Sequence, residues 1–262
     1  MPFTLSHAAA ALPFRRTHLI PSALVAGCFA PDFEYFLGHH GAFGHKLPGM
    51  FFFDLPLAFA ALWLFHHFAK EPLAGCLPEG SRERFDLGPK SLSINSLSRL
   101  AVILLSILIG VATHIIWDSF THAGYWPTNN WHILKVIVRL PLFGPRPAYA
   151  ILQYISSVLG LAAILLWYIH WYLNTTPVRQ KPDRRSVVSS RIAMAVAFAV
   201  AVFAALIRAI IGGLPEGVHG AQRFMTSAAI TGLATFWIEV LIYGFIRNLT
   251  EARSKAASIG VR

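Results

Sequence analysis

The sequence predicts an all-α integral membrane protein, a polytopic helical bundle with five or six spans. Of its 262 residues, 55% are hydrophobic and only 13% are charged, whereas about a quarter of the residues in a typical soluble domain are charged. Five apolar stretches reach or approach the roughly 20 residues that a helix needs to cross a bilayer. None of them shows the period-two alternation of a barrel strand, and lipid offers no partner to open peptide groups, so each span is expected to be helical.

The expected spans follow one another along the chain, at about residues 51–68, 98–121, 148–173, 192–213 and 225–247. A further stretch at 19–37 is apolar but contains Pro21, Pro31, Asp32 and Glu34. Proline interrupts helical hydrogen bonding, and a carboxylate at membrane depth is costly. This stretch could therefore span the membrane, enter and return, or lie in the interface.

Two loop-like stretches, at 72–96 and 174–190, separate the apolar ones and are rich in Gly, Pro, Ser or charged residues. We expect residues 1–173 to form a membrane domain that carries the candidate site. Residues 174–262 are expected to form a C-terminal helical pair packed on the same bundle. The last two spans are rich in alanine and other small residues, which suits close helix contact in lipid.

The basic residues predict the orientation in the membrane. The formal net charge is +10, but no basic run is interleaved with aromatic residues, so no nucleic-acid partner is expected. With five spans, the connections at 69–97 (with Arg99) and 174–191 and the tail from Arg247 hold 14 Lys or Arg, and the opposite side holds 7. Positive residues favour the cytoplasmic side, so this bias predicts a cytoplasmic C-terminus.

The ten residues from Thr113 to His122, THIIWDSFTH, place three polar side chains at the end of a long apolar stretch. His114, Asp118 and His122 are four residues apart, so on an α-helix they share one face. Imidazole and carboxylate are the usual ligands of zinc and similar divalent ions. Polar groups in a lipid-facing helix are costly, and they mark functional sites. We predict a metal centre at this end of the helix.

The N-terminal part of the chain supplies further candidate ligands: His7, Asp32, Glu34, His39, His40, His45 and Asp54. Histidine with carboxylate, without cysteine, suits zinc, manganese or iron and is more typical of a catalytic site than of a structural zinc site. Simpler interpretations exist. His114 and Asp118 could be a buried hydrogen-bonded pair that holds two helices together. Asp54, shortly before Pro56, has the pattern of a cap at the start of a span.

Four stretches of the chain resemble a known family: MPFTLSHAAAALPF at the N-terminus, SALVAGCFAPDFEYFL, HKLPGMFFFDLPLAF and THIIWDSFTHAG. In order and spacing they resemble a bacterial membrane family called domain of unknown function 4184, from Met1 to about Trp171. That family is similar, more distantly, to membrane-bound metal-dependent hydrolases and to zinc-dependent phospholipase C enzymes.

The resemblance implies a His/Asp metal centre on a helical scaffold. The ligands that it implies are His7, Asp32, His45, His114 and Asp118, with His122 as a further one. Zinc is the expected metal, with manganese or iron as alternatives, and Asp118 or Asp32 is the expected base or metal-bridging group. The phospholipases complete their site with a downstream His-x-x-x-Glu, which this sequence lacks after His122.

The expected function is hydrolysis of a lipid or lipid-linked phosphoester or ester at the extracytoplasmic face. The site lies at head-group depth, and a divalent ion acidifies water and polarises a phosphoryl or carbonyl oxygen. Membrane lipids are the expected partners, and the expected location is the inner (plasma) membrane of a bacterium. Two other classes remain open: an ion- or proton-coupled transporter that uses the His and Asp groups as a path, and a non-catalytic membrane scaffold.

Overall fold

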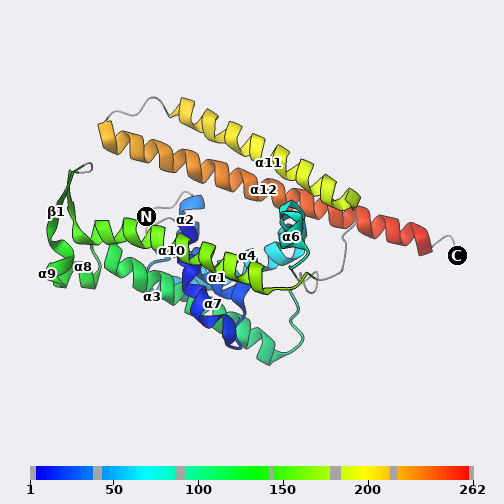
Figure 1. Ribbon diagram of the computed structural model, residues 1–262, viewed down its shortest axis with the longest axis horizontal. Coiled ribbons are helices and arrows are strands. Elements are labelled where there is room, and N and C mark those ends of the chain that lie inside the picture. Colours follow the sequence, from blue (N-terminus) through cyan, green and yellow to red (C-terminus); the bar gives the residue numbers. More distant parts are fainter. Residues whose placement is uncertain are drawn as a thin grey trace. The chain divides into compact units, whose positions relative to one another are not determined.

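The computed structural model describes residues 4–37, 43–85, 92–141, 144–177, 184–212 and 217–259. Within these ranges the chain is helical apart from loops and one two-stranded antiparallel ribbon, which confirms the predicted all-α class (Figure 1). Five helices are long and apolar enough to cross a membrane: Leu47–Cys76, Leu97–Asn130, Ala148–Asn174, Ser186–Ile211 and Phe224–Ser254. They coincide with the five expected spans. Because it has five such helices, the chain is a membrane protein.

The stretch at 19–37 does not form a sixth long helix. It folds as α1 (Pro21–Phe29), followed by the single 3-10 turn η2 (Ala30–Asp32) and the short helix α2 (Phe33–Phe36). Nine residues of α-helix extend about 14 Å, which is half the thickness of a bilayer core. Proline at its start and again just after its end limits α1 to this length.

Two compact units make up the chain: Met1–Leu62 with Ile94–Asn174, and Trp63–Ser93 with Thr175–Arg262. The boundary falls inside a continuous helical stretch composed of α3 (Leu47–Gly49), η3 (Met50–Asp54), α4 (Leu55–Leu64), η4 (Phe65–Ala69) and α5 (Lys70–Cys76). This grouping joins 63–93 to the C-terminal helices. The expected domains, 1–173 and 174–262, stay a prediction.

In the first unit, the helix α7 (Leu97–Thr121) carries the THIIWDSFTH motif. It begins after Ser96, whose hydroxyl accepts a hydrogen bond from the Arg99 N–H at 3.1 Å and so caps the first turn. After α7 come α8 (Trp126–Asn130), α9 (His132–Lys135), the strands β1 (Ile137–Leu140) and β2 (Gly144–Pro147), and the long helix α10 (Ala148–Asn174).

The N-terminal segment enters and returns along α7. Helix η1 (Thr4–Arg16) starts beside His114, since the ring of His7 stacks on that of His114 with centroids 3.9 Å apart. The chain then turns, and the Ile20 N–H donates to Ser106 Oγ at 3.0 Å. Ser106 is about 12 Å along α7 from His114. Helix α1 returns over that distance, so η1 and α1 form a hairpin against α7.

Two glycines allow α1 to pack very closely on α7. A Cβ atom at Gly27 would lie 2.1 Å from the Ile107 carbonyl oxygen, and one at Gly110 would lie 2.2 Å from the Leu24 carbonyl oxygen. Small residues permit this backbone approach between helices in lipid. The close crossing brings the carbonyl at the end of α1 within hydrogen-bonding distance of the next turn of α7.

The second unit contains η4, α5, α6 (Glu79–Arg82), α11 (Arg184–Ile211) and α12 (Gly217–Ile259). Arg247 on α12 pairs with Glu71 on α5, Nη2 to Oε2 at 3.0 Å, and Asn248 donates to the His67 carbonyl at 2.8 Å. A Cβ at Gly244 would lie 1.9 Å from the Phe68 carbonyl oxygen. These contacts fix α12 on the η4–α5 stretch.

Replacing Gly110 by alanine should destabilise the first unit, because the added Cβ would meet backbone rather than a movable side chain. We expect a loss of about 1–3 kcal/mol and a lower thermal unfolding midpoint of the detergent-purified protein. Gly232→Ala on α12 is the matched control, since its Cβ would lie at an ordinary 3.4 Å from its neighbours. Equal midpoints for the two variants would contradict the close crossing.

Candidate metal centre

Five buried side chains from four segments of the first unit converge at one end of α7. Each is at most 7% exposed. They are His7 on η1, Asp32 at the end of η2, His45 in the loop before α3, and His114 and Asp118 on α7. They are five of the six residues that the family resemblance implied as metal ligands, and His122 is the sixth. Three of them lie on three segments that precede α7 in the sequence, and the structure brings these three to the pair on α7.

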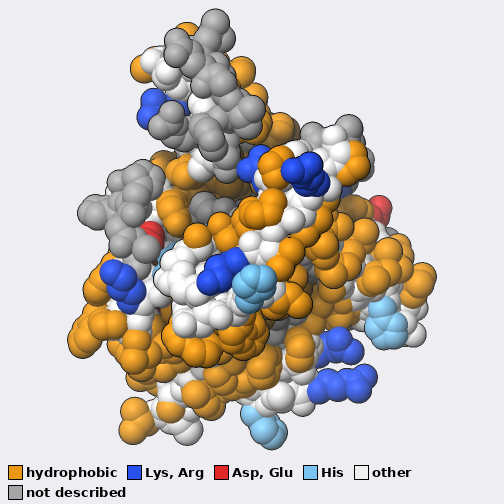
Figure 2. Space-filling view, turned by 90° about the vertical axis from the view of Figure 1, so that its left-hand side faces the viewer, with side chains coloured by type: hydrophobic (Ala, Val, Ile, Leu, Met, Phe, Trp, Pro, Cys, Tyr) orange, Lys and Arg blue, Asp and Glu red, His pale blue; other side chains and the backbone are white. Residues whose placement is uncertain are grey.

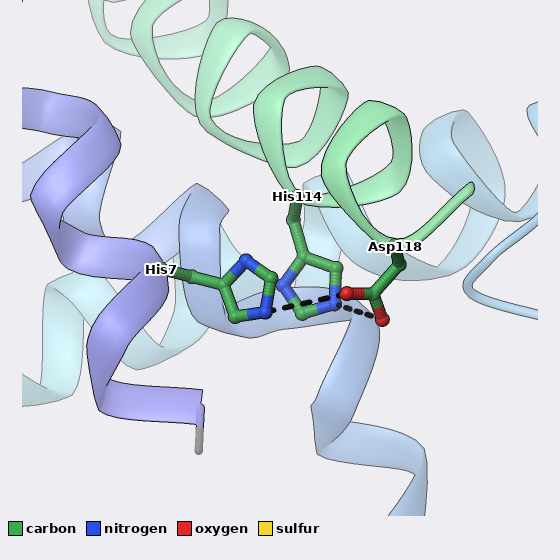
Figure 3. Close-up of side chains that lie close together, drawn as sticks. All are labelled: His7, His114 and Asp118. Carbon is green, nitrogen blue, oxygen red and sulfur yellow. Dashed lines mark ion pairs between the residues drawn. The ribbon is translucent and has the colours of Figure 1, made fainter. Parts of the chain in front are cut away.

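Asp118 lies between two imidazoles. Its Oδ1 is 3.4 Å from His7 Nε2, and its Oδ2 is 3.4 Å from His114 Nε2 (Figure 3). The α-helix places His114 and Asp118 on one face, one turn apart, as the spacing predicted. The His7 ring reaches them from η1 and stacks on the His114 ring at an interplanar angle of 17°.

Asp32 and His45 close the other side of the cluster. Asp32 Oδ1 is 3.8 Å from both His45 Nε2 and His114 Nε2, and His45 Nε2 is 3.6 Å from Asp118 Oδ2. The separations between these donor atoms therefore range from 3.4 to 3.8 Å. Ligand atoms bound tetrahedrally to zinc at about 2.0–2.2 Å are about 3.3–3.6 Å apart. The spacing suits a metal ion without a large rearrangement.

In three of these side chains, the polar atom that faces away from the cluster makes a hydrogen bond with a neighbouring group. His114 Nδ1 donates to the Cys28 carbonyl at 2.7 Å, and this leaves Nε2 for the cluster. His45 Nδ1 donates to Glu34 Oε1 at 3.3 Å in the same way, and Glu34 is itself held by the Phe43 N–H at 3.1 Å. Partners of this kind fix the tautomer and direction of metal-binding histidines.

Asp32 is oriented by a hydroxyl. Thr4 Oγ1 donates to Asp32 Oδ2 at 2.5 Å, which leaves Oδ1 facing the histidines. Burial raises the pKa of Asp32, so the buried carboxylate needs a positive partner to stay ionised. Burial also lowers the pKa of His7 to about 3, so its imidazole is neutral at pH 7, which is the form that binds a metal.

Three polar atoms in the cluster make no hydrogen bond within the described residues. They are His7 Nε2, His114 Nε2 and Asp118 Oδ1, all buried. A buried polar atom without a partner costs free energy, and such atoms call for an explanation. Two overlapping groups, His7 with His114 and Asp118, and Asp32 with His45 and His114, have the donor spacing to hold a metal ion. A bound ion would satisfy these atoms.

His122 lies at the edge of the cluster. Helix α7 ends at Thr121, and His122 is extended at φ −122° and ψ 144°, so the helical spacing that the motif indicated stops one residue before it. Its Nδ1 is 3.5 Å from Asp118 Oδ2, and its side chain is 26% exposed. It belongs to neither group of closely spaced donors. Its role as a ligand stays a prediction.

The remaining candidates from the sequence have different outcomes. Glu34 contacts a ligand and not the centre itself, and nothing in the sequence indicated the hydroxyl of Thr4. Asp54 is not a helix cap: it ends η3 inside a continuous helical stretch that begins near Leu47, and both its buried carboxylate oxygens lack a hydrogen bond within the described residues. His39 and His40 lie outside the described residues.

The fold and the site together define a helical membrane protein whose buried His/Asp side chains could hold a metal ion. A family model described as Domain of unknown function (DUF4184) matches residues 1–245. The chain belongs to this family. The match extends past Trp171, where the motif resemblance was placed, into the last two spans. No curated protein and no solved structure matched the chain.

Changing Glu34 to Gln should weaken metal binding without removing a ligand. The carboxylate that orients His45 would become a neutral amide, and partners of this kind typically contribute 10- to 100-fold to metal affinity. We expect a loss of about 10-fold or more in zinc affinity, measured by competition with a chelator of known affinity. Glu71→Gln, which removes a carboxylate paired with Arg247 in the second unit, should bind zinc as the wild type does. Unchanged affinity in Glu34→Gln would contradict the orienting role.

Proposed function

We propose that the protein is a membrane-embedded, metal-dependent hydrolase that acts on a lipid or lipid-linked phosphoester or ester at the extracytoplasmic face. The observation that carries this proposal is the convergence of five buried donor side chains, three of which have their other polar atom held by a neighbour. In functional metal centres, hydrogen bonds from neighbouring groups usually hold the metal-binding side chains in the correct orientation.

The donor set favours zinc and catalysis. Metal ligation requires neutral imidazoles, and with two carboxylates such a cluster would carry a formal charge that one divalent ion balances. Histidine and carboxylate without thiolate are typical of catalytic zinc sites, and manganese and iron accept the same donors. The one nearby cysteine, Cys28, contributes only its backbone carbonyl to His114, while its Sγ lies 3.6 Å from Thr113 Oγ1.

In this proposal, different residues of the chain have different roles in hydrolysis. A divalent ion held here would polarise a phosphoryl or carbonyl oxygen and acidify water. Asp118, whose two oxygens face different imidazoles, would hold His7 and His114 in place. We assign proton acceptance to Asp32, because the raised pKa of this carboxyl favours taking up a proton and Thr4 fixes its direction. His122, on the exposed edge, would face the substrate.

The depth of the site supports a lipid substrate. Asp118 lies within the last turn of α7, and the chain continues into the exposed side chains of Trp126 and Trp131. Tryptophan is enriched where head groups meet the hydrocarbon core. The scissile bond of a phospholipid lies at that level. The Lys and Arg bias supports the proposed orientation, with this end on the extracytoplasmic side of a bacterial inner membrane and the C-terminus in the cytoplasm.

A second candidate is a structural metal lock, in which the ion only ties η1 to α7. The burial of all five ligands favours it, because a catalytic ion needs access for substrate and water. A transporter has less support, because the described polar cluster lies at one end of α7 and not at mid-membrane, where transport sites are found.

The metal should be found by elemental mass spectrometry on the full-length, detergent-purified protein. We expect about one or two ions of zinc, manganese or iron per chain in the wild type, and loss of the metal in His114→Ala and Asp118→Ala variants that elute as folded species. His132→Ala, an exposed histidine outside the cluster, should keep its metal. A metal-free wild type that cannot be reloaded would rule out both candidates.

Hydrolysis separates the two candidates. Metal-loaded protein should cleave phospholipid or lipid-linked ester substrates in mixed micelles, lose this activity with a chelator, and regain it when the metal is returned. In Asp32→Asn, loss of the proton-accepting carboxylate should lower the rate by about 100-fold or more, measured as product formed per metal-loaded chain. Protein that binds the ion and is stabilised by it, but cleaves none of these substrates, would establish the structural lock.

A further inference from the structure

The chain between α7 and α10 exposes many apolar side chains. Trp126 on α8 is 67% exposed, Ile133 on α9 is 72% exposed and Ile137 on β1 is 60% exposed. Trp131, Val136 and Val138 are also exposed. We call residues 126–141 and 144–147 the interfacial platform. An apolar surface of this kind indicates a partner or a membrane.

The platform could not hold its shape by itself in water. Its helices α8 and α9 have five and four residues, whereas isolated helices shorter than about 12 residues are marginal. Its ribbon has only two strands, paired with Val138 opposite Arg146, and an isolated two-stranded ribbon is marginally stable at best. Burial of its exposed apolar side chains in another medium would supply the missing stability.

Continuity with the spans identifies that medium as the lipid surface. The platform begins at Trp126, separated by four residues from the end of α7 at Thr121, and α10 begins at Ala148 immediately after β2. Both α7 and α10 belong to helices long enough to cross a membrane. The platform therefore joins two spans at one membrane face. Exposed tryptophans at that level are typical of an interface, since their rings are apolar and their N–H groups are polar.

The charge of the platform selects the kind of lipid. The sequence from 122 to 147 contains Lys135, Arg139 and Arg146 and no Asp or Glu. Figure 2, which views the end of the molecule where β1, α8 and α9 lie, shows Lys, Arg and His side chains set among hydrophobic ones. A basic surface with apolar side chains binds anionic membranes by charge attraction and apolar burial together.

We propose that the interfacial platform lies in the head-group layer and enriches anionic phospholipid beside the His/Asp centre. His122 links the two regions, because its carbonyl accepts a hydrogen bond from Thr128 Oγ1 on α8 at 2.7 Å while its ring faces Asp118. That the enriched lipid is also the substrate rests on the proposed hydrolase function. The enrichment itself does not require hydrolysis.

A fluorophore at position 137 tests this surface. Ile137→Cys is labelled in a Cys76→Ser background, since Cys76 is exposed and Cys28 is buried. The full-length protein is placed in nanodiscs of phosphatidylcholine and phosphatidylglycerol, with bromine on the acyl chains of one lipid or of the other at equal mole fraction. Quenching by brominated phosphatidylglycerol should exceed quenching by brominated phosphatidylcholine by about twofold or more.

Variants assign the effect to the platform. Lys135→Gln with Arg139→Gln should bring the quenching ratio to about one, while Arg99→Gln with Arg253→Gln, which removes two exposed charges elsewhere, should leave it unchanged. His114→Ala should also keep the enrichment, so that failure of the metal centre and failure of this surface give different results. Quenching by neither lipid would overturn the membrane contact. Equal quenching by both in the wild type would overturn the selection of anionic lipid.

Discussion

The hydrogen bond from His114 Nδ1 to the Cys28 carbonyl is the contact on which the centre depends. It joins α7 to the end of α1, and it also commits Nε2 of the imidazole to the cluster. Cys28 reaches His114 only because Gly27 and Gly110 let the two helix backbones approach within the distance that any side chain would prevent. Packing between the helices and the chemistry of the site are thus set by the same few atoms. Asp32 and His45, two members of the cluster, follow α1 along the chain, so their positions depend on this crossing as well.

A second constraint comes from burial. Asp118 and Asp32 are carboxylates enclosed with three histidines, and an enclosed carboxylate is stable as an anion only with a positive or strongly donating partner. Thr4 provides one donor to Asp32, and Glu34 orients His45 without contributing a ligand atom. Within the cluster, His7 Nε2, His114 Nε2 and Asp118 Oδ1 make no hydrogen bond in the described part of the chain, and each imidazole nitrogen lies 3.4 Å from an oxygen of Asp118. The same enclosure that makes a metal ion favourable also limits access, and the exposed edge at His122 is the side from which a substrate would approach.

Local patterns in the sequence were sufficient for the helices and for part of the site. Apolar length and helical period are local properties, so the five spans and the shared face of His114 and Asp118 could be predicted. The meeting of His7, Asp32 and His45 with α7 could not be worked out from spacing, because it depends on a hairpin that turns between Arg16 and Ile20 and on a glycine crossing far along the chain. The four-residue spacing predicts that His122 lies on the same helical face, but the helix ends at Thr121. Pro56 gives Asp54 the pattern of a helix cap, but the helical stretch begins earlier, with Pro48 in its first turn.

The separation of the ligands along the chain has a consequence for biogenesis. A ribosome makes His7, Asp32 and His45 well before His114 and Asp118, and the N-terminal hairpin packs on two helices that are made later, with α1 on α7 and η1 on α10. Until α7 has entered the membrane, His7, Asp32 and His45 lack His114 and Asp118, the two side chains beside which they are buried. The hairpin therefore docks late, after helices that follow it in sequence are in place, and the donor groups that could hold a metal ion come together only when that step is complete. Insertion of the second and third of the five long helices, which contain α7 and α10, thus precedes assembly of the whole cluster.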